Sequence, residues 1–131
     1  MEVNETIENV EKIKKNALVC VKNSWGMRMP GEHGYVVTKD GELYSYQLHT
    51  RVTEATKELC KNYFKKVKNV SEQFMQEINN YFEENISGKE FPYVRIYDAS
   101  YIVEMNGVVI DNQTEIYKDF EELIRAEIER T

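Results

Sequence analysis

The sequence predicts a two-layer α+β fold in which antiparallel hairpins pack under amphipathic helices, in the order α-βββ-α(α)-βββ-α. Two observations support this prediction. Apolar residues recur at helical spacing in three stretches of the chain. Between these stretches, Asp40-Gly41 and Asn106-Gly107 are dipeptides typical of tight hairpin turns. A chain of 131 residues with no Pro/Gly/Ser-rich linker is expected to form a single globular domain over residues 1–131.

The first elements are predicted by apolar periodicity. Residues 4–15 form a helix with one apolar stripe, and residues 17–21 form a continuous apolar run, which predicts a strand buried on both faces. Residues 23–33 are expected to be a loop. A two-residue turn at Asp40-Gly41 would then place Val37 opposite Tyr44, in a hairpin with an aromatic face.

The second half of the chain is predicted in the same way. Residues 52–84 show helical spacing with a break at Ser71, which can cap a new helix. A strand is expected over residues 93–97, and Asn106-Gly107 should pair Val103 with Ile110 in the last hairpin. The final helix is expected to begin near Asn112, with Asn112 and Glu115 spaced as a capping box.

The overall charge excludes some classes of protein. The formal net charge is −6 and the pI is about 5.0, which argues against general nucleic-acid binding and against anionic membranes. An acidic protein suits a basic partner. The N-terminus lacks the features of a signal peptide, and no apolar run is long enough for a membrane span. Both cysteines, Cys20 and Cys60, lie in apolar stretches, so a reducing, cytoplasmic location is expected.

The most unusual stretch of the sequence is residues 22–35, which read Lys-Asn-Ser-Trp-Gly, then Gly-Glu-His-Gly-Tyr after a short connection. This stretch resembles the strand–loop–strand around the active-site asparagine of papain-family cysteine proteases. The resemblance implies that Asn23 matches the asparagine that orients the catalytic histidine and that Trp25 matches the tryptophan that shields it. It covers about fourteen residues. The family's segment around the nucleophilic cysteine is absent, and no histidine precedes Asn23, so a local similarity in a hairpin is favoured over a protease.

A thiol or hydrolase-type enzyme is an alternative hypothesis. Its candidate catalytic residues are Asn23 and His33 with Cys20 or Cys60, and His49 is a second candidate base. Buried structural cysteines are the more common case. The spacing of these residues matches no zinc motif, and the sequence predicts neither a metal nor a cofactor.

A second alternative is a nucleic-acid accessory protein. On a helix over residues 52–70, four lysines would form a basic stripe opposite the apolar face that could meet phosphates; they are Lys57, Lys61, Lys65 and Lys68. The solvated face of an amphipathic helix is the favoured interpretation of this stripe.

The favoured function is a small protein-binding domain, of an inhibitor or immunity type that occludes a basic partner. Aromatic, arginine and methionine side chains are typical of interface hot spots. The candidate binding residues are Trp25, Met27, Arg28, Met29, Tyr93, Arg95 and Tyr97. For the Tyr93–Tyr97 strand, burial of this face under a helix is the competing interpretation.

Overall fold

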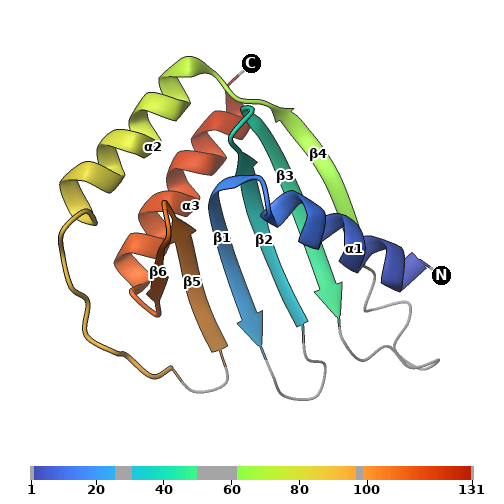
Figure 1. Cartoon of the computed structure of the whole chain (residues 1–131), viewed down its shortest axis with the longest axis horizontal. Coiled ribbons are helices and arrows are strands. Elements are labelled where there is room, and N and C mark those ends of the chain that lie inside the picture. Colours follow the sequence, from blue (N-terminus) through green and yellow to red (C-terminus); the bar gives the residue numbers. More distant parts are fainter. Residues whose placement is uncertain (1, 26–30, 50–61, 97–98, 131) are drawn as a thin grey trace.

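The computed structural model describes residues 2–25, 31–49, 62–96 and 99–130. In chain order (Figure 1) the elements are α1 (Glu2–Lys14), β1 (Ala17–Trp25), β2 (Gly31–Thr38), β3 (Glu42–His49), β4 (Tyr63–Asn69), α2 (Glu72–Asn85), β5 (Ala99–Met105), β6 (Val108–Asp111) and α3 (Thr114–Glu129).

The described strands form one antiparallel sheet of six strands in the order β4-β3-β2-β1-β5-β6. The two groups of strands join because β1 pairs with β5 as well as with β2, placing Val21 between Tyr35 and Val103. The predicted α+β class, with antiparallel hairpins under helices, is therefore confirmed, and both hairpins belong to a single sheet.

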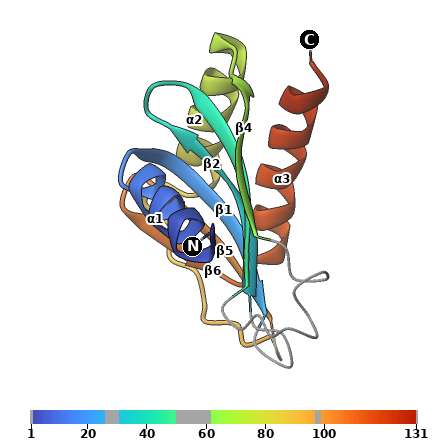
Figure 2. The ribbon, with the colours of Figure 1, turned by 90° about the vertical axis from the view of Figure 1, so that its right-hand side faces the viewer.

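Helices cover both faces of this sheet, because β1 alternates between two apolar clusters. Val19 and Val21 pack into the larger cluster with α2 and α3, whereas Cys20 packs into the smaller cluster with Val10 of α1. Figure 2 shows α1 and α3 on opposite sides of the sheet. The continuous apolar run at residues 17–21 predicted this two-sided burial correctly.

The first hairpin has a different register from the prediction. Val37 pairs with Leu43 and Val36 with Tyr44, so the prediction that Val37 faces Tyr44 was wrong. The loop is three residues long: Gly41 donates its N–H to the Thr38 carbonyl at 3.0 Å and has a φ of +82°. A register change of one residue moves each side chain to the other face. Tyr44 consequently lies on the α1 face, stacked on Phe64 at 5.1 Å between ring centroids.

The predicted helix over residues 52–84 was partly wrong. Residues 63–69 form β4, an edge strand paired with β3, and residues 50–61 lie outside the described part of the chain. Tyr63 and Val67 are four residues apart, a spacing that fits one face of a helix and one face of a strand equally well. The break at Ser71 is confirmed, because Ser71 Oγ accepts a hydrogen bond from the Phe74 N–H at 3.1 Å and caps α2.

Near the C-terminus one turn was predicted correctly and two other features were not. Asn106 and Gly107 have φ values of 51° and 79°, as a type I′ turn requires, and Val103 pairs with Ile110. Residues 93–96 have irregular backbone, not strand, because the Val94 carbonyl accepts from the Asn112 side chain instead of from a neighbouring strand. The capping box at Asn112 was also wrong. Asn112 is left-handed, with a φ of 58°, and α3 begins at Thr114.

A buried carboxylate ties the end of α3 to the start of α2. Glu127 has no exposed surface. Its Oε2 accepts the Ser71 N–H at 2.6 Å, its Oε1 accepts from Arg130 at 2.8 Å, and Lys68 Nζ lies 3.7 Å away. Lys68 also donates to the carbonyls of Glu127 and Arg130, at 2.8 and 2.6 Å. A buried charge persists only when it is paired and hydrogen-bonded in this way.

Replacing Glu127 with alanine is expected to destabilise the domain by about 3 kcal/mol, because it leaves the partly buried Lys68 and Arg130 without their carboxylate. Urea unfolding followed by circular dichroism measures the change. The control is Glu129→Ala on the exposed side of the same helix turn, which should change the free energy of unfolding by less than about 0.5 kcal/mol. Equal effects of the two substitutions would contradict this role.

Candidate functional site

The candidate site lies on the α3 face of the sheet, where the apolar cluster ends. Along β1 this face changes from Val19 and Val21 to Asn23 and Trp25. Cross-strand pairing brings residues from three strands together at this end: Asn23 opposite His33, and His33 opposite Gln47. We call the set formed by Asn23, Trp25, His33, Gln47 and His49 the polar sheet end. Residues 23–33 were predicted as a loop, but Asn23–Trp25 belong to β1 and Gly31–His33 to β2, because the two strands continue pairing to Trp25 and Gly31.

Trp25 lies between two histidines. Its ring centroid is 5.5 Å from that of His33 and 5.7 Å from that of His49, the second pair being edge-on. The close approach depends on Gly31, since a Cβ atom there would lie 2.6 Å from the Leu48 carbonyl oxygen and 3.1 Å from both the Trp25 ring and His49 Nδ1. Trp25 is thus packed against the sheet, as the sequence predicted for a local hairpin similarity.

His49 is the more buried of the two histidines, at 6% exposure. Its backbone N–H donates to Asn62 Oδ1 at 2.8 Å, and its Nε2 lies 3.2 Å from Gln47 Nε2. His49 Nδ1 and Asn62 Nδ2 are buried, and within the described residues neither has a hydrogen-bond partner. The sequence identified neither Gln47 nor Asn62. The sequence could have identified Gln47, because a residue two positions before His49 on one strand lies on the same face of the sheet.

The asparagine does not orient a histidine here. Asn23 Nδ2 donates to the Ser100 carbonyl of β5 at 3.2 Å, so it fastens β1 to β5. His33 faces the same side from the next strand, but within the described residues it makes no hydrogen bond with Asn23. This arrangement lacks the base–orienter contact of a catalytic triad.

Burial favours the neutral form of His33. Burial lowers the pKa of His33 below its ordinary value of 6.5, and the carboxylate of Glu121 on α3 partly offsets this shift. The imidazole is therefore neutral at pH 7, flanked by Trp25 on one side of the site.

Cys20 lies on the opposite face of the sheet from His33. It packs in the α1 cluster, and burial raises the pKa of its thiol to about 11. A buried, protonated thiol separated from both histidines by the sheet is not a nucleophile at neutral pH. Cys60, the other candidate nucleophile, lies outside the described residues.

The α1 face carries a buried polar group that the sequence did not reveal. Tyr46 is fully buried, and its hydroxyl donates to Glu32 Oε2 at 2.6 Å. Lys14 of α1 reaches the same carboxylate at 3.4 Å and lies over the Tyr46 ring. Burial would raise the pKa of Glu32, but the Tyr46 hydrogen bond and the Lys14 charge together lower it. The group attaches α1 to the sheet.

The predicted binding residues are divided between described and undescribed segments. Tyr93 and Arg95 are exposed, in the segment that follows α2. Figure 1 shows this segment running to one end of the sheet, where β1 and β3 end and where β2 and β5 begin. Trp25 is the last residue of β1 and therefore belongs to the same end. Trp25 is packed between His33 and His49, and the remaining predicted binding residues, Met27, Arg28, Met29 and Tyr97, lie outside the described residues.

The basic helical stripe is not formed. Lys65 and Lys68 lie on β4, so residues 63–69 form a strand and not the predicted helix. Lys57 and Lys61 lie outside the described residues. Lys68 is already bound to the end of α3. The cause of this error is the same as before: residues four apart share one face of a helix and also one face of a strand.

Comparison of the chain with known protein families, with curated proteins and with solved structures found no match. Within the described parts of the chain, no helix combines the length and apolar character needed to cross a membrane. In the same ranges, no three His, Cys, Asp or Glu side chains are placed to hold a metal ion.

The lowered pKa of His33 predicts a pH-dependent stability. Unfolded His33 takes up a proton near pH 6.5, whereas folded His33 does so only at lower pH. The unfolded state therefore binds more protons in this window, and the free energy of unfolding should fall as the pH drops below about 6.5. Urea unfolding between about pH 7.5 and pH 5.5 measures the slope. His33→Gln should flatten it, and an unchanged slope in this variant would contradict the assignment.

The raised pKa of Cys20 predicts a slow thiol. In the folded protein at about pH 8, Cys20 should react with iodoacetamide at least tenfold more slowly than free cysteine, because little thiolate forms and the sulfur is buried. Peptide mass spectrometry distinguishes Cys20 from Cys60. Denaturation in urea should abolish the protection, and fast labelling of native Cys20 would revive the thiol-enzyme hypothesis.

Proposed function

We propose that this chain is a small cytoplasmic protein-binding domain of an inhibitor or immunity type, which docks on a basic partner through the segment that carries Tyr93 and Arg95. The observation that supports it is the exposure of Tyr93, whose surface is 80% accessible although its backbone is held in place. Tyrosine and arginine are among the residues that are enriched at interface hot spots.

The backbone of this segment is fixed by the two side chains that immediately precede α3. Asn112 Nδ2 donates to the Val94 carbonyl at 2.8 Å, and Gln113 Nε2 donates to the Pro92 carbonyl at 2.7 Å. Asn112 Oδ1 also accepts the Tyr101 N–H of β5 at 2.9 Å, so the segment is attached to the sheet. A segment fixed before binding loses less conformational entropy when a partner docks.

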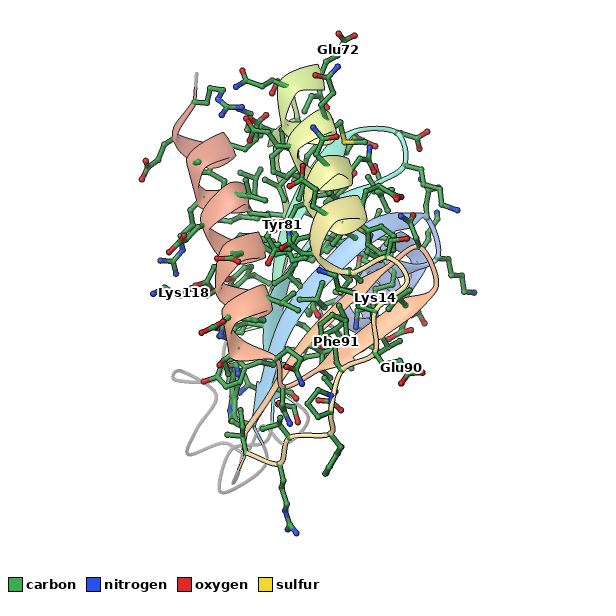
Figure 3. The ribbon with its side chains drawn as sticks, turned by 90° about the vertical axis from the view of Figure 1, so that its left-hand side faces the viewer. Lys14, Glu72, Tyr81, Glu90, Phe91 and Lys118 are labelled. Atoms are coloured by element: carbon green, nitrogen blue, oxygen red, sulfur yellow. The ribbon has the colours of Figure 1, made fainter. Side chains whose placement is uncertain are left out.

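The charge of the domain favours a basic partner. The net charge is −6, and α2 carries Glu72, Glu77, Glu83 and Glu84 with no lysine or arginine. Beside α2, the surface of α3 adds Asp119 and Glu122, which line a hollow together with Leu123 and Ala126. In Figure 3, Tyr81 of α2 lies between the two helices, where its hydroxyl donates to Asp119 at 2.7 Å. Such a field steers and accelerates association with a positively charged protein.

The test is affinity capture of the partner from a native lysate, followed by measurement of its affinity for purified variants. The captured protein should be basic. Tyr93→Ala and Arg95→Ala should each weaken its binding by about tenfold or more, and the double variant by more than either. Raising the salt concentration should slow association.

The matched control is Val109→Ala. Val109 is also an exposed apolar side chain, at 62%, but it lies on β6 next to the Asn106-Gly107 turn. This substitution should leave the affinity within about twofold, and all variants should keep the wild-type melting temperature because none of the three side chains is in the core. Unchanged affinity for both segment variants, or an acidic captured partner, would refute the proposal.

A further inference from the structure

A row of three hydrogen-bond donors crosses the α3 face of the sheet. Tyr35 of β2 pairs with Ser45 of β3, and Ser45 pairs with Lys65 of β4. Directly paired side chains on one face have Cβ atoms about 5 Å apart. The same row continues through Val21 and Val103, which lie in the apolar cluster under α2 and α3. The row therefore begins with two apolar side chains, Val103 and Val21, and continues with two hydroxyl groups and one ammonium group.

The donor row borders a hollow of about 310 Å³ between the sheet and the end of α3. Its lining is Tyr35, Ser45, Lys65, Lys66, Val67 and Ile128. Val67 of β4 and Ile128 of α3 also pack against the main apolar cluster. The hollow thus has apolar walls on one side and donors on the other, and its volume is that of a site for a small metabolite.

Within the described residues, the three donors have no acceptor. Ser45 is 91% buried, with 9% exposure, yet its hydroxyl makes no hydrogen bond there, and neither does the Tyr35 hydroxyl. Lys65 lies over the Tyr63 ring and makes no ion pair in the described part of the chain. Both hydroxyls border the hollow, so they can donate to a ligand oxygen placed there.

We propose that this hollow binds a small carboxylate with a short branched hydrocarbon part. The carboxylate accepts hydrogen bonds from Ser45 and Tyr35 and pairs with Lys65, since a carboxylate is an acceptor with two oxygens. The hydrocarbon part lies against Val67 and Ile128. This inference is independent of the Tyr93 segment and of the proposed partner.

Two carboxylates on the elements around the hollow form ion pairs with other side chains. Glu42 pairs with Lys66 at 2.8 Å, and Glu121 of α3 pairs with Arg125 at 3.6 Å. The carbonyls at the C-terminal end of α3 accept from Lys68. Lys65 therefore supplies a positive charge that these neighbours do not cancel.

The test uses sodium isovalerate as the probe and its neutral isostere isovaleramide as the comparison, with binding followed by two-dimensional NMR of the labelled protein. Isovalerate should bind saturably, with a dissociation constant on the order of 1 mM, and should shift the amide signals of β3, β4 and the last turn of α3. Isovaleramide should bind at least about tenfold more weakly.

Three variants test the donors, and a fourth tests whether binding requires Lys65 itself or any surface lysine. Lys65→Met should weaken isovalerate binding by about tenfold, and Ser45→Ala and Tyr35→Phe by about threefold to tenfold each. The control is Lys118→Met, since Lys118 points outward from α3 in Figure 3. Its binding should be unchanged. Each variant's spectrum reports directly whether it is folded.

Several outcomes would overturn the proposal. They are the absence of saturable binding up to roughly 50 mM isovalerate, equal binding of isovaleramide, or unchanged binding in folded Lys65→Met. A loss in Lys118→Met equal to that in Lys65→Met would mean that isovalerate associates with surface charge alone, which also overturns it.

Discussion

The structure depends on the register between β2 and β3, because the sheet is buried on both faces. The three-residue loop closed by Gly41 pairs Val37 with Leu43, and this sends Val37 and Leu43 to α2 and α3 while Val36, Tyr44 and Tyr46 go to the α1 side. A slip of one residue would exchange the two sets, placing the Tyr46 hydroxyl in the larger apolar cluster and removing it from Glu32. The same register sets Tyr35, Ser45 and Lys65 in one row and His33 opposite Gln47.

On the face of the sheet under α2 and α3, the side chains change from apolar to polar along the strands. The face under α2 and α3 is apolar at Val19 and Val37, mixed at the row of Tyr35 and Ser45, and polar at Asn23 and His33. Buried polar groups need partners, and the domain supplies them unevenly. Glu127 and Glu32 are each hydrogen-bonded and paired with a cation; Glu127 ties α3 to α2, and Glu32 ties α1 to the sheet. Ser45 and Tyr35 face a hollow and have no acceptor among the described residues, which is the observation behind the proposed carboxylate site.

Much of the fold could be predicted from local pattern, but only part of the site. The helix capped by Ser71, the Asn106-Gly107 turn and the two-sided burial of β1 each depend on neighbours within a few residues, so the sequence was sufficient for them. The errors arose where one pattern fits two structures. A four-residue apolar spacing suggested helix at Tyr63 and Val67, and Asn112-x-x-Glu115 suggested a cap although Asn112 instead bridges Tyr101 and Val94. Trp25, His33 and His49 were each noticed, but not their mutual contact.

The sequence alone determined the α+β class, the acidic character, and the presence of helices that each have one apolar stripe, because these follow from composition and from periodicity along the chain. The tertiary structure decided which residues meet. Pairing β1 with β5 joins residues 19–25 to residues 99–105, and pairing β4 with β3 brings Lys65 to Ser45. Such contacts depend on strand order and register. These are set by how the whole sheet buries its two faces, and no local stretch of sequence contains that information.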